Sequence, residues 1–168
     1  MISPSRGLFV YVPVAVVPIY LLIRHWRDLP HRPLAAMGAA IVVTNVLIVA
    51  SWLSWWGGYS IGPRLLTDTI PWFVMIAILG WKGRENCYLR APSGKAPRTV
   101  DRMFTAVAVL LAVFSVAING WGATSQQPLR WNKRVDVYAH PECLWDWRSP
   151  QFLAGLMPAG NPASVRCH

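Results

Sequence analysis

The sequence predicts an all-α integral membrane protein with four transmembrane helices and a short outward C-terminal tail. Of the 168 residues, 54% are hydrophobic and only 14% are charged, against about 25% in a typical soluble domain. The apolar residues gather in four long segments, and most of the basic residues lie between those segments. The hydrophobic content excludes intrinsic disorder, and the scattered cations argue against a nucleic-acid-binding face.

Each apolar segment has the length of a membrane span. The segments cover residues 7–23, 34–56, 65–81 and 103–121, and Asp68 is the one charged residue within them. A helix needs about 20 residues to cross the hydrocarbon core, with a range of about 17–25. The backbone in lipid must satisfy its own hydrogen bonds, so we expect all four segments to be helices.

The first segment contains Pro13 and Pro18, which would weaken a helix in water. In a membrane, neighbouring helices can satisfy the carbonyl groups that a proline leaves free. A cleaved signal peptide is the alternative, because Arg6 precedes the apolar run. No cleavage site of small residues follows Ile23, so we expect the segment to stay in the protein as a span.

The basic residues predict the orientation of the chain. Nine of the sixteen cations lie in the links 24–33 and 82–102, and the positive-inside rule makes this side cytoplasmic. The N-terminus, the loop 57–64 and the tail 122–168 then face outward. The link 82–102 contains Pro92, Gly94 and Pro97 and is expected to be a solvated turn that serves as a topology determinant, with contact of its cations to membrane lipid head groups as the alternative.

The tail 122–168 is rich in proline, glycine and tryptophan and is too short for a deep core of its own. We expect it either to lie on the membrane surface or to pack on the outer loops. Cys143 and Cys167 could form a disulfide in an oxidising compartment, whereas Cys87 should face the cytoplasm. Cys143 and Cys167, together with His140 and His168, are a conceivable zinc set. Their spacing matches no standard zinc finger, so no metal site is predicted.

The outward loop between the second and third segments carries the most informative residues. The second helix is expected to end at Gly57 and Gly58, because a glycine pair stops a helix at low cost. Pro63 suits the first turn of the third helix. Arg64 follows at the membrane boundary, and Asp68 lies four residues later, where the two side chains can pair.

Trp52, Trp55, Trp56 and Tyr59 are spaced to form one aromatic stripe if the second helix persists that far. The stripe is either an interfacial aromatic belt or a stacking surface for sugar rings or an isoprenoid chain. Arg64 likewise has two interpretations. It is either an interfacial cation that extends to water, or a clamp for a lipid phosphate, since guanidinium matches phosphate oxygens in a bidentate way.

Two segments resemble a known family. The run 55–66, WWGGYSIGPRLL, resembles the late-helix motif of bacterial polytopic glycosyltransferases of the GT-C type, relatives of protein O-mannosyltransferases and aminoarabinose transferases. The tail looks like the C-terminal ending of the same kind of protein, and the residues that carry this likeness are Trp131-Asn132, Val135-Asp136, His140-Pro141, Leu144 to Trp147 and Pro150 to Phe152. The resemblance spans about residues 52–152.

The resemblance implies a multi-pass protein of the bacterial inner membrane that takes a sugar from a polyprenyl phosphate on the extracytoplasmic face. Arg64 would then contact the donor phosphate, and Tyr59 and Ser60 would line the sugar site. The remaining donor-binding candidates are Gly57, Gly58, Trp55 and Trp56. No cofactor is firmly implied, and the need for a divalent cation stays open.

One departure from the family pattern concerns the catalytic base. The family's proposed base is an aspartate in the first outer loop, just after the first helix, and this chain has no counterpart there. Asp68 is a weak substitute, so the catalytic residue is unknown. We therefore expect the C-terminal part of a larger enzyme, incomplete without N-terminal helices or another membrane subunit. The alternative is a non-enzymatic membrane subunit or a structural membrane protein.

Overall fold

The computed structural model describes residues 2–90 and 98–156, and every regular element in these ranges is helical. Three helical stretches are long and apolar enough to cross a membrane: Arg32–Ser51, Arg64–Arg90 and Asp101–Thr124. A shorter apolar helix covers Pro13–Arg24. The prediction of an all-α membrane protein is thus confirmed at this level for the described residues, with three spans of sufficient length in place of four.

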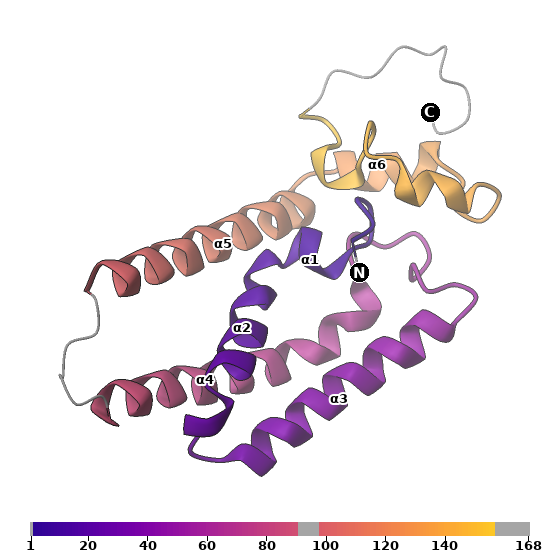
Figure 1. Ribbon diagram of the computed structural model, residues 1–168. Helices are drawn as coiled ribbons and strands as arrows, with labels where there is room; N and C mark the ends of the chain where they lie inside the picture. The colour runs from indigo at the N-terminus through magenta and orange to yellow at the C-terminus, as the bar shows by residue number, and fades with distance from the viewer. Residues whose placement is uncertain (1, 91–97, 157–168) are drawn as a thin grey trace. The chain divides into compact units, whose positions relative to one another are not determined.

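The elements follow one another along the chain as shown in Figure 1. The described residues form the α-helices α1 (Leu8–Tyr11), α2 (Val16–Arg24), α3 (Arg32–Ser51), α4 (Ile70–Arg90), α5 (Arg98–Thr124) and α6 (Gln127–Arg134). The 3-10 turns are η1 (Pro13–Ala15), η2 (Trp26–Asp28), η3 (Arg64–Thr69), η4 (Pro141–Trp145) and η5 (Gln151–Leu153).

By its internal contacts the chain forms two compact units, each assembled from separate parts of the sequence. Unit 1 comprises Met1–Pro13, Leu53–Leu65 and Phe114–His168, and unit 2 comprises Val14–Trp52 and Leu66–Val113. The N-terminus, the outward loop and the tail therefore pack together in unit 1. Of the two expectations for the tail, packing on the loop Leu53–Leu65 is the one that the structure shows.

Unit 2 is built around α4, which packs against α2 and α3. Glycines allow these close approaches. A Cβ atom at Gly80 would lie 2.6 Å from the Cβ of Leu21 on α2, and one at Gly38 of α3 would lie 2.5 Å from the terminal methyl of Met75. Small residues at helix contacts are typical of membrane bundles, because packing replaces the hydrophobic effect there.

Much of the apolar surface of the long helices is exposed. On α3 the exposed side chains include Val43, Leu47 and Ile48, and on α5 they include Val107, Leu110 and Val113. In water an apolar surface of this extent would promote aggregation, whereas in a bilayer it is the surface expected to contact lipid. The outward apolar faces therefore agree with helices that lie in lipid.

The first apolar segment is not one helix, and this corrects the prediction of a continuous span over 7–23. The run breaks between α1 and η1, where Val12 has φ −131° and ψ 61°. Val12 precedes Pro13, and the proline ring disfavours helical backbone at the residue before it. Pro13 therefore had a stronger effect than expected, and α2 begins only at Val16, whereas Pro18 lies inside α2 without breaking it.

The second helix ends earlier than predicted. α3 stops at Ser51, and Trp52 has extended backbone with φ −76° and ψ 138°. The helix therefore ends six residues before Gly57, and the glycine pair lies inside a non-helical loop. The predicted stripe of Trp52, Trp55, Trp56 and Tyr59, which required a continuous helix, does not form.

The predicted solvated turn over 82–102 is largely helical. α4 continues through Arg90 and α5 begins at Arg98, while residues 91–97 lie outside the described ranges. Arg84 is buried: it pairs with Asp101 and lies over the rings of Trp81, Tyr88 and Phe104 at 4.6–5.6 Å. This arginine therefore joins α4 to α5 and is not a freely solvated topology signal.

Candidate functional site

The outward loop Leu53–Leu65 is shaped by glycines with left-handed backbone. Gly57, Gly58 and Gly62 have φ of 73°, 72° and 64°. At Gly62 a Cβ atom would also lie 2.9 Å from the ring of Tyr11, so the close approach of the N-terminal segment excludes a side chain there. Other residue types pay about 1–2 kcal/mol for this conformation, which explains why the loop needs glycine.

Asn132 of α6 holds the backbone of this loop. Its Nδ2 donates to the carbonyl oxygens of Tyr59 and Ser60, both at 2.9 Å, and its side chain is buried. The carbonyl oxygen of the Asn132 side chain in turn accepts from Gln151 Nε2 at 3.0 Å. One amide thus satisfies two loop carbonyls that burial would otherwise leave unpaired.

Gln151 of η5 makes a second set of bonds to the same region. Its Nε2 donates to the carbonyl oxygen of Ser60 at 3.1 Å, and its Oε1 accepts from the Tyr11 hydroxyl at 3.1 Å. The residue is fully buried. Because Tyr11 comes from the N-terminal segment, Gln151 ties three distant stretches of unit 1 together.

Arg6 completes a buried polar cluster with Asn132 and Gln151. Its NH2 group donates to the carbonyl oxygen of Gly58 at 3.2 Å and to Asn132 Oδ1 at 2.9 Å, and its NH1 group donates to Gln151 Oε1. These partners are neutral. Burial of the guanidinium lowers the pKa of Arg6 to about 10, while the nearby Tyr11 acts in the opposite direction.

The loop and tail also meet through aromatic side chains, which we call the outer aromatic cluster. Trp55 lies 5.7 Å from Trp145 between ring centroids, and Tyr138 lies 5.8 Å from Trp56 and 5.4 Å from Tyr59. Tyr59, Tyr138 and Trp145 are each about half exposed. Trp55, Trp56 and Tyr59 of the predicted stripe therefore form a surface with partners from the tail, whereas Trp52 belongs to unit 2.

Tyr59 and Asp136 form a polar contact beside this cluster. The Tyr59 hydroxyl donates to Asp136 Oδ1 at 3.1 Å, and the backbone N–H groups of Tyr138 and Ala139 donate to the same oxygen. Those backbone hydrogen bonds are the largest cause of the lowered pKa of Asp136. The pKa of Tyr59 is raised by desolvation and by its bond to the carboxylate. Asp136 thereby fixes the Tyr59 ring against the tail.

Two polar groups of the loop are buried without a hydrogen-bond partner among the described residues. They are the indole N–H of Trp56 and the hydroxyl of Ser60. An unpaired buried donor costs about 1–3 kcal/mol. Trp56 and Ser60 therefore each have unused hydrogen-bonding capacity, and both are among the residues that the family resemblance suggests for binding the sugar donor.

Arg64 and Asp68, the other predicted site residues, both have exposed side chains. Arg64 ends the loop and begins η3, and its backbone N–H donates to the carbonyl oxygen of Gly62 at 3.0 Å. Arg64 belongs to unit 1 and Asp68 to unit 2. The pairing expected between them stays a prediction.

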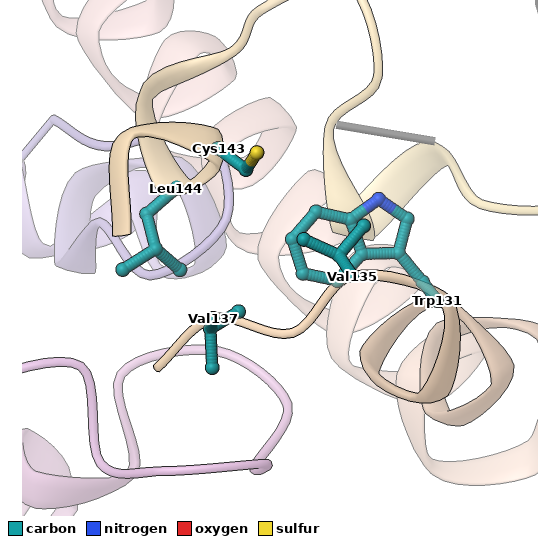
Figure 2. Close-up of a cluster of buried hydrophobic side chains, with 5 residues drawn as sticks. All are labelled: Trp131, Val135, Val137, Cys143 and Leu144. Carbon is teal, nitrogen blue, oxygen red and sulfur yellow. The ribbon is translucent and has the colours of Figure 1, made fainter. Parts of the chain in front are cut away.

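The tail is packed on a small apolar cluster, shown in Figure 2, that consists of Trp131, Val135, Val137, Cys143 and Leu144. Trp55 and Trp56 pack against it from the loop. Cys143 is disulfide-bonded and Cys87 is free, while Cys167 and His168 lie outside the described residues. His140 Nδ1 lies 3.1 Å from Glu142, so the conceivable zinc set gains no support from the described part of the tail.

Local sequence patterns carry only weak signals for the residues that organise this site. Asn132 and Gln151 stand in the tail segments that resemble the glycosyltransferase ending, but no role followed from that pattern. Arg6 was recognisable only as a basic residue that precedes an apolar run. Its burial depends on contacts more than 120 residues away, which local patterns do not report.

Comparisons of the chain with protein families, with curated proteins and with solved structures found no match.

Proposed function

We propose that the chain is the membrane-embedded part of a glycosyltransferase that uses a polyprenyl-phosphate-linked sugar on the extracytoplasmic face of a bacterial inner membrane. In this proposal the chain binds the sugar donor but does not supply the whole reaction. The site for the acceptor and the remaining catalytic groups come from further transmembrane helices or from another membrane subunit.

The observation that carries the proposal is the junction between the two segments that resemble this enzyme class. Asn132 and Gln151, from the tail segments, bind the backbone of Tyr59 and Ser60, from the loop segment. Two segments about 70–90 residues apart along the chain thus build one structure. This arrangement supports the interpretation that both belong to one binding site.

Arg64 is the proposed contact for the donor phosphate. It follows the glycine-containing loop, its side chain is exposed, and it begins one of the apolar stretches long enough to span a membrane. A guanidinium at that position can form bidentate charge-assisted bonds to a lipid phosphate. The unpaired N–H of Trp56 and hydroxyl of Ser60 could add neutral hydrogen bonds to the donor.

The outer aromatic cluster is the proposed surface for the sugar or the first isoprene units. Its half-exposed rings belong to Tyr59, Tyr138 and Trp145. Aromatic faces of this kind pack on apolar ligand surfaces while their polar atoms reach water. An interfacial aromatic belt stays the alternative interpretation of the same residues.

The reaction class separates the roles of the residues. The bond between the anomeric carbon and the phosphate oxygen breaks, the acceptor oxygen bonds to that carbon, and the acceptor proton passes to a base. Arg64 would stabilise the departing phosphate, because a fixed cation is most effective where negative charge develops. The base is not assigned in this chain, and Asp68 is its weak candidate.

The contacts of unit 1 also support four membrane crossings. The loop Leu53–Leu65 and the tail are separated by two long apolar stretches and therefore lie on one side. Ser3 Oγ donates to the carbonyl oxygen of Leu144 at 2.6 Å, so the N-terminus lies on that side as well. We therefore propose that the broken helical run 8–24 is the fourth crossing, with a length at the lower limit of about 17 residues.

The test is binding of a polyprenyl phosphate to the purified chain in detergent. Wild type is compared with Arg64→Ala, Arg64→Lys and the control Arg130→Ala, which removes an exposed arginine of α6. We expect saturable binding by wild type and by the control. Both Arg64 variants should lose at least tenfold in affinity, because lysine is a point charge that lacks the planar fork.

Equal affinity of Arg64→Lys and wild type would identify Arg64 as an interfacial cation and contradict the clamp. Absence of binding by a folded wild type would contradict donor binding by this chain. That result would favour the alternative of a non-enzymatic membrane subunit, for which the exposed apolar faces of α3 and α5 offer contact surfaces.

A further inference from the structure

A second group of chemically reactive side chains lies in unit 2, apart from the proposed donor site. His25 follows α2, Asp28 ends the turn η2, and Cys87 lies on α4. One ligand atom from each residue, the imidazole nitrogen, a carboxylate oxygen and the thiol sulfur, lies within 4.8 Å of the other two. The fold thus brings two neighbouring residues of a turn to a cysteine about 60 positions later.

His25 shows that this group is not satisfied as it stands. Only 8% of the residue is exposed, and its Nδ1 atom is buried with no hydrogen-bond partner among the described residues. A buried nitrogen of this kind costs about 1–3 kcal/mol if it stays unpaired. Imidazole is the commonest metal ligand in proteins and can bind through either ring nitrogen.

The backbone around the group is fixed, so the three side chains are held in place. The amide of Asp28 donates to the carbonyl oxygen of His25 at 2.9 Å. Asn86, the residue before Cys87, donates from Nδ2 to the carbonyl oxygen of Asp28 at 3.2 Å. The absence of a side chain at Gly83 lets the turn approach α4, because a Cβ there would lie 3.0 Å from Leu29.

We propose that His25, Asp28 and Cys87 form a zinc-binding site that fastens the η2 turn to α4. Nitrogen, oxygen and sulfur are the ligand atoms that zinc takes in proteins, at about 2.0–2.3 Å in tetrahedral geometry. Ligand atoms at those distances lie roughly 3.3–3.8 Å apart, so the observed group needs only small side-chain movements. Three protein ligands leave the fourth position to water.

The charges around the group are compatible with a divalent cation. On metal binding the Cys87 thiol releases its proton to solvent, and thiolate and carboxylate together balance the two charges of zinc. Arg90 faces the site and binds Asp28 Oδ1 at 3.3 Å, but its own side chain is largely exposed. The second carboxylate oxygen can bind the metal while Arg90 keeps its contact. Arg24 and Arg84 also lie near enough to act on His25, and their positive charges oppose a bound cation, so the thiolate and the carboxylate have to offset them.

The test uses the metal-free full-length chain in detergent, titrated with Zn²⁺ against a chromophoric chelator and with Co²⁺ as a spectroscopic probe. We expect one metal ion per chain and an absorption band from thiolate-to-cobalt charge transfer. Cys87→Ser should abolish that band, and Cys87→Ser and Asp28→Asn should each lower zinc affinity at least tenfold. The control Glu85→Gln, which changes an exposed carboxylate two residues from Cys87, should bind like wild type.

A second readout does not depend on substitutions. Bound Zn²⁺ should slow alkylation of Cys87 at least tenfold, measured by mass spectrometry of the peptide that contains it. Unchanged alkylation, absence of stoichiometric binding, or binding that Cys87→Ser leaves intact would each overturn the proposal. Loss of binding in His140→Ala alone would assign the metal to the tail and overturn it as well.

Discussion

At the scale of single residues, Asn132 does more for unit 1 than its place in a short helix suggests. Its side chain satisfies two loop carbonyls and accepts from both Arg6 and Gln151. Replacement of the side chain removes a hydrogen-bond partner from buried polar groups on three other segments and leaves the carbonyl oxygen of Tyr59 without its bond to Nδ2. The penalty for such groups is larger than the gain from the bonds themselves, because each has lost its water.

We therefore expect Asn132→Leu, which keeps the branched shape of the side chain but removes its polar atoms, to destabilise unit 1 by about 2–4 kcal/mol. The neighbouring exposed variant Lys133→Ala should change stability by less than about 0.5 kcal/mol. The measurement is thermal unfolding of the chain in detergent, followed by tryptophan fluorescence. Equal midpoints for the two variants would mean that the buried polar cluster does not hold the loop.

Gly62 offers a second test of the loop. Its φ of 64° and the 2.9 Å approach of a Cβ to the Tyr11 ring both oppose a side chain. Gly62→Ala should lower the unfolding midpoint by several degrees, since left-handed backbone alone costs about 1–2 kcal/mol. Gly120→Ala on α5 is the matched control: its Cβ meets nothing within 4 Å, so it should leave the midpoint unchanged or raise it. The opposite order of the two midpoints would contradict this view of the loop.

Part of this site was predictable from sequence. The glycines, Arg64 and the aromatic residues were identified as one informative loop, because turn residues and interfacial aromatics have local signatures. The residues that bind the loop from the N-terminus and the tail were not predictable from sequence. Arg6 and Gln151 are 145 residues apart along the chain, and a hydrogen bond over that separation leaves no periodic pattern.

At the scale of elements, the long helices followed the apolar pattern and the connections did not. Segment 103–121 lies inside α5, and segment 65–81 lies within η3 and α4. The helices continue beyond those segments into charged sequence at Arg84 and Asp101. Hydropathy locates the part of a helix that lies in lipid, but a helix can extend into water where its polar side chains find partners.

The contact of Arg84 with Asp101 and three aromatic rings explains this extension and can be tested. Arg84→Met keeps much of the packing but removes the charge that pairs with Asp101. We expect a loss of about 1–3 kcal/mol, below the value for a fully buried pair because Asp101 is partly exposed. The exposed Lys82→Met on the same helix should have little effect on the unfolding midpoint. A similar midpoint for both would show that the α4–α5 contact depends on apolar packing alone.

At the scale of the whole molecule, the number of crossings connects the sequence to the structure. Apolar length alone identifies three spans and a shorter helix, Pro13–Arg24. The four-span prediction rested on treating 7–23 as one helix, and the break before Pro13 removes that basis. Our proposal of a fourth crossing rests instead on the hydrogen bonds of Ser3 and Arg6 with the tail, since residues that bind one another lie on the same side of the membrane.

The proposed orientation allows three and four membrane crossings to be distinguished by experiment. With four crossings, an epitope tag before Met1 and one after His168 should both be accessible to an impermeant protease in spheroplasts. A tag inserted within residues 91–97 should be protected until the membrane is opened, since the positive-inside rule places that link in the cytoplasm. With three crossings, the two terminal tags would differ in accessibility. The bonds from Ser3 and Arg6 to the tail could then not form in the membrane, and the proposed donor site would lose the polar cluster that holds its loop.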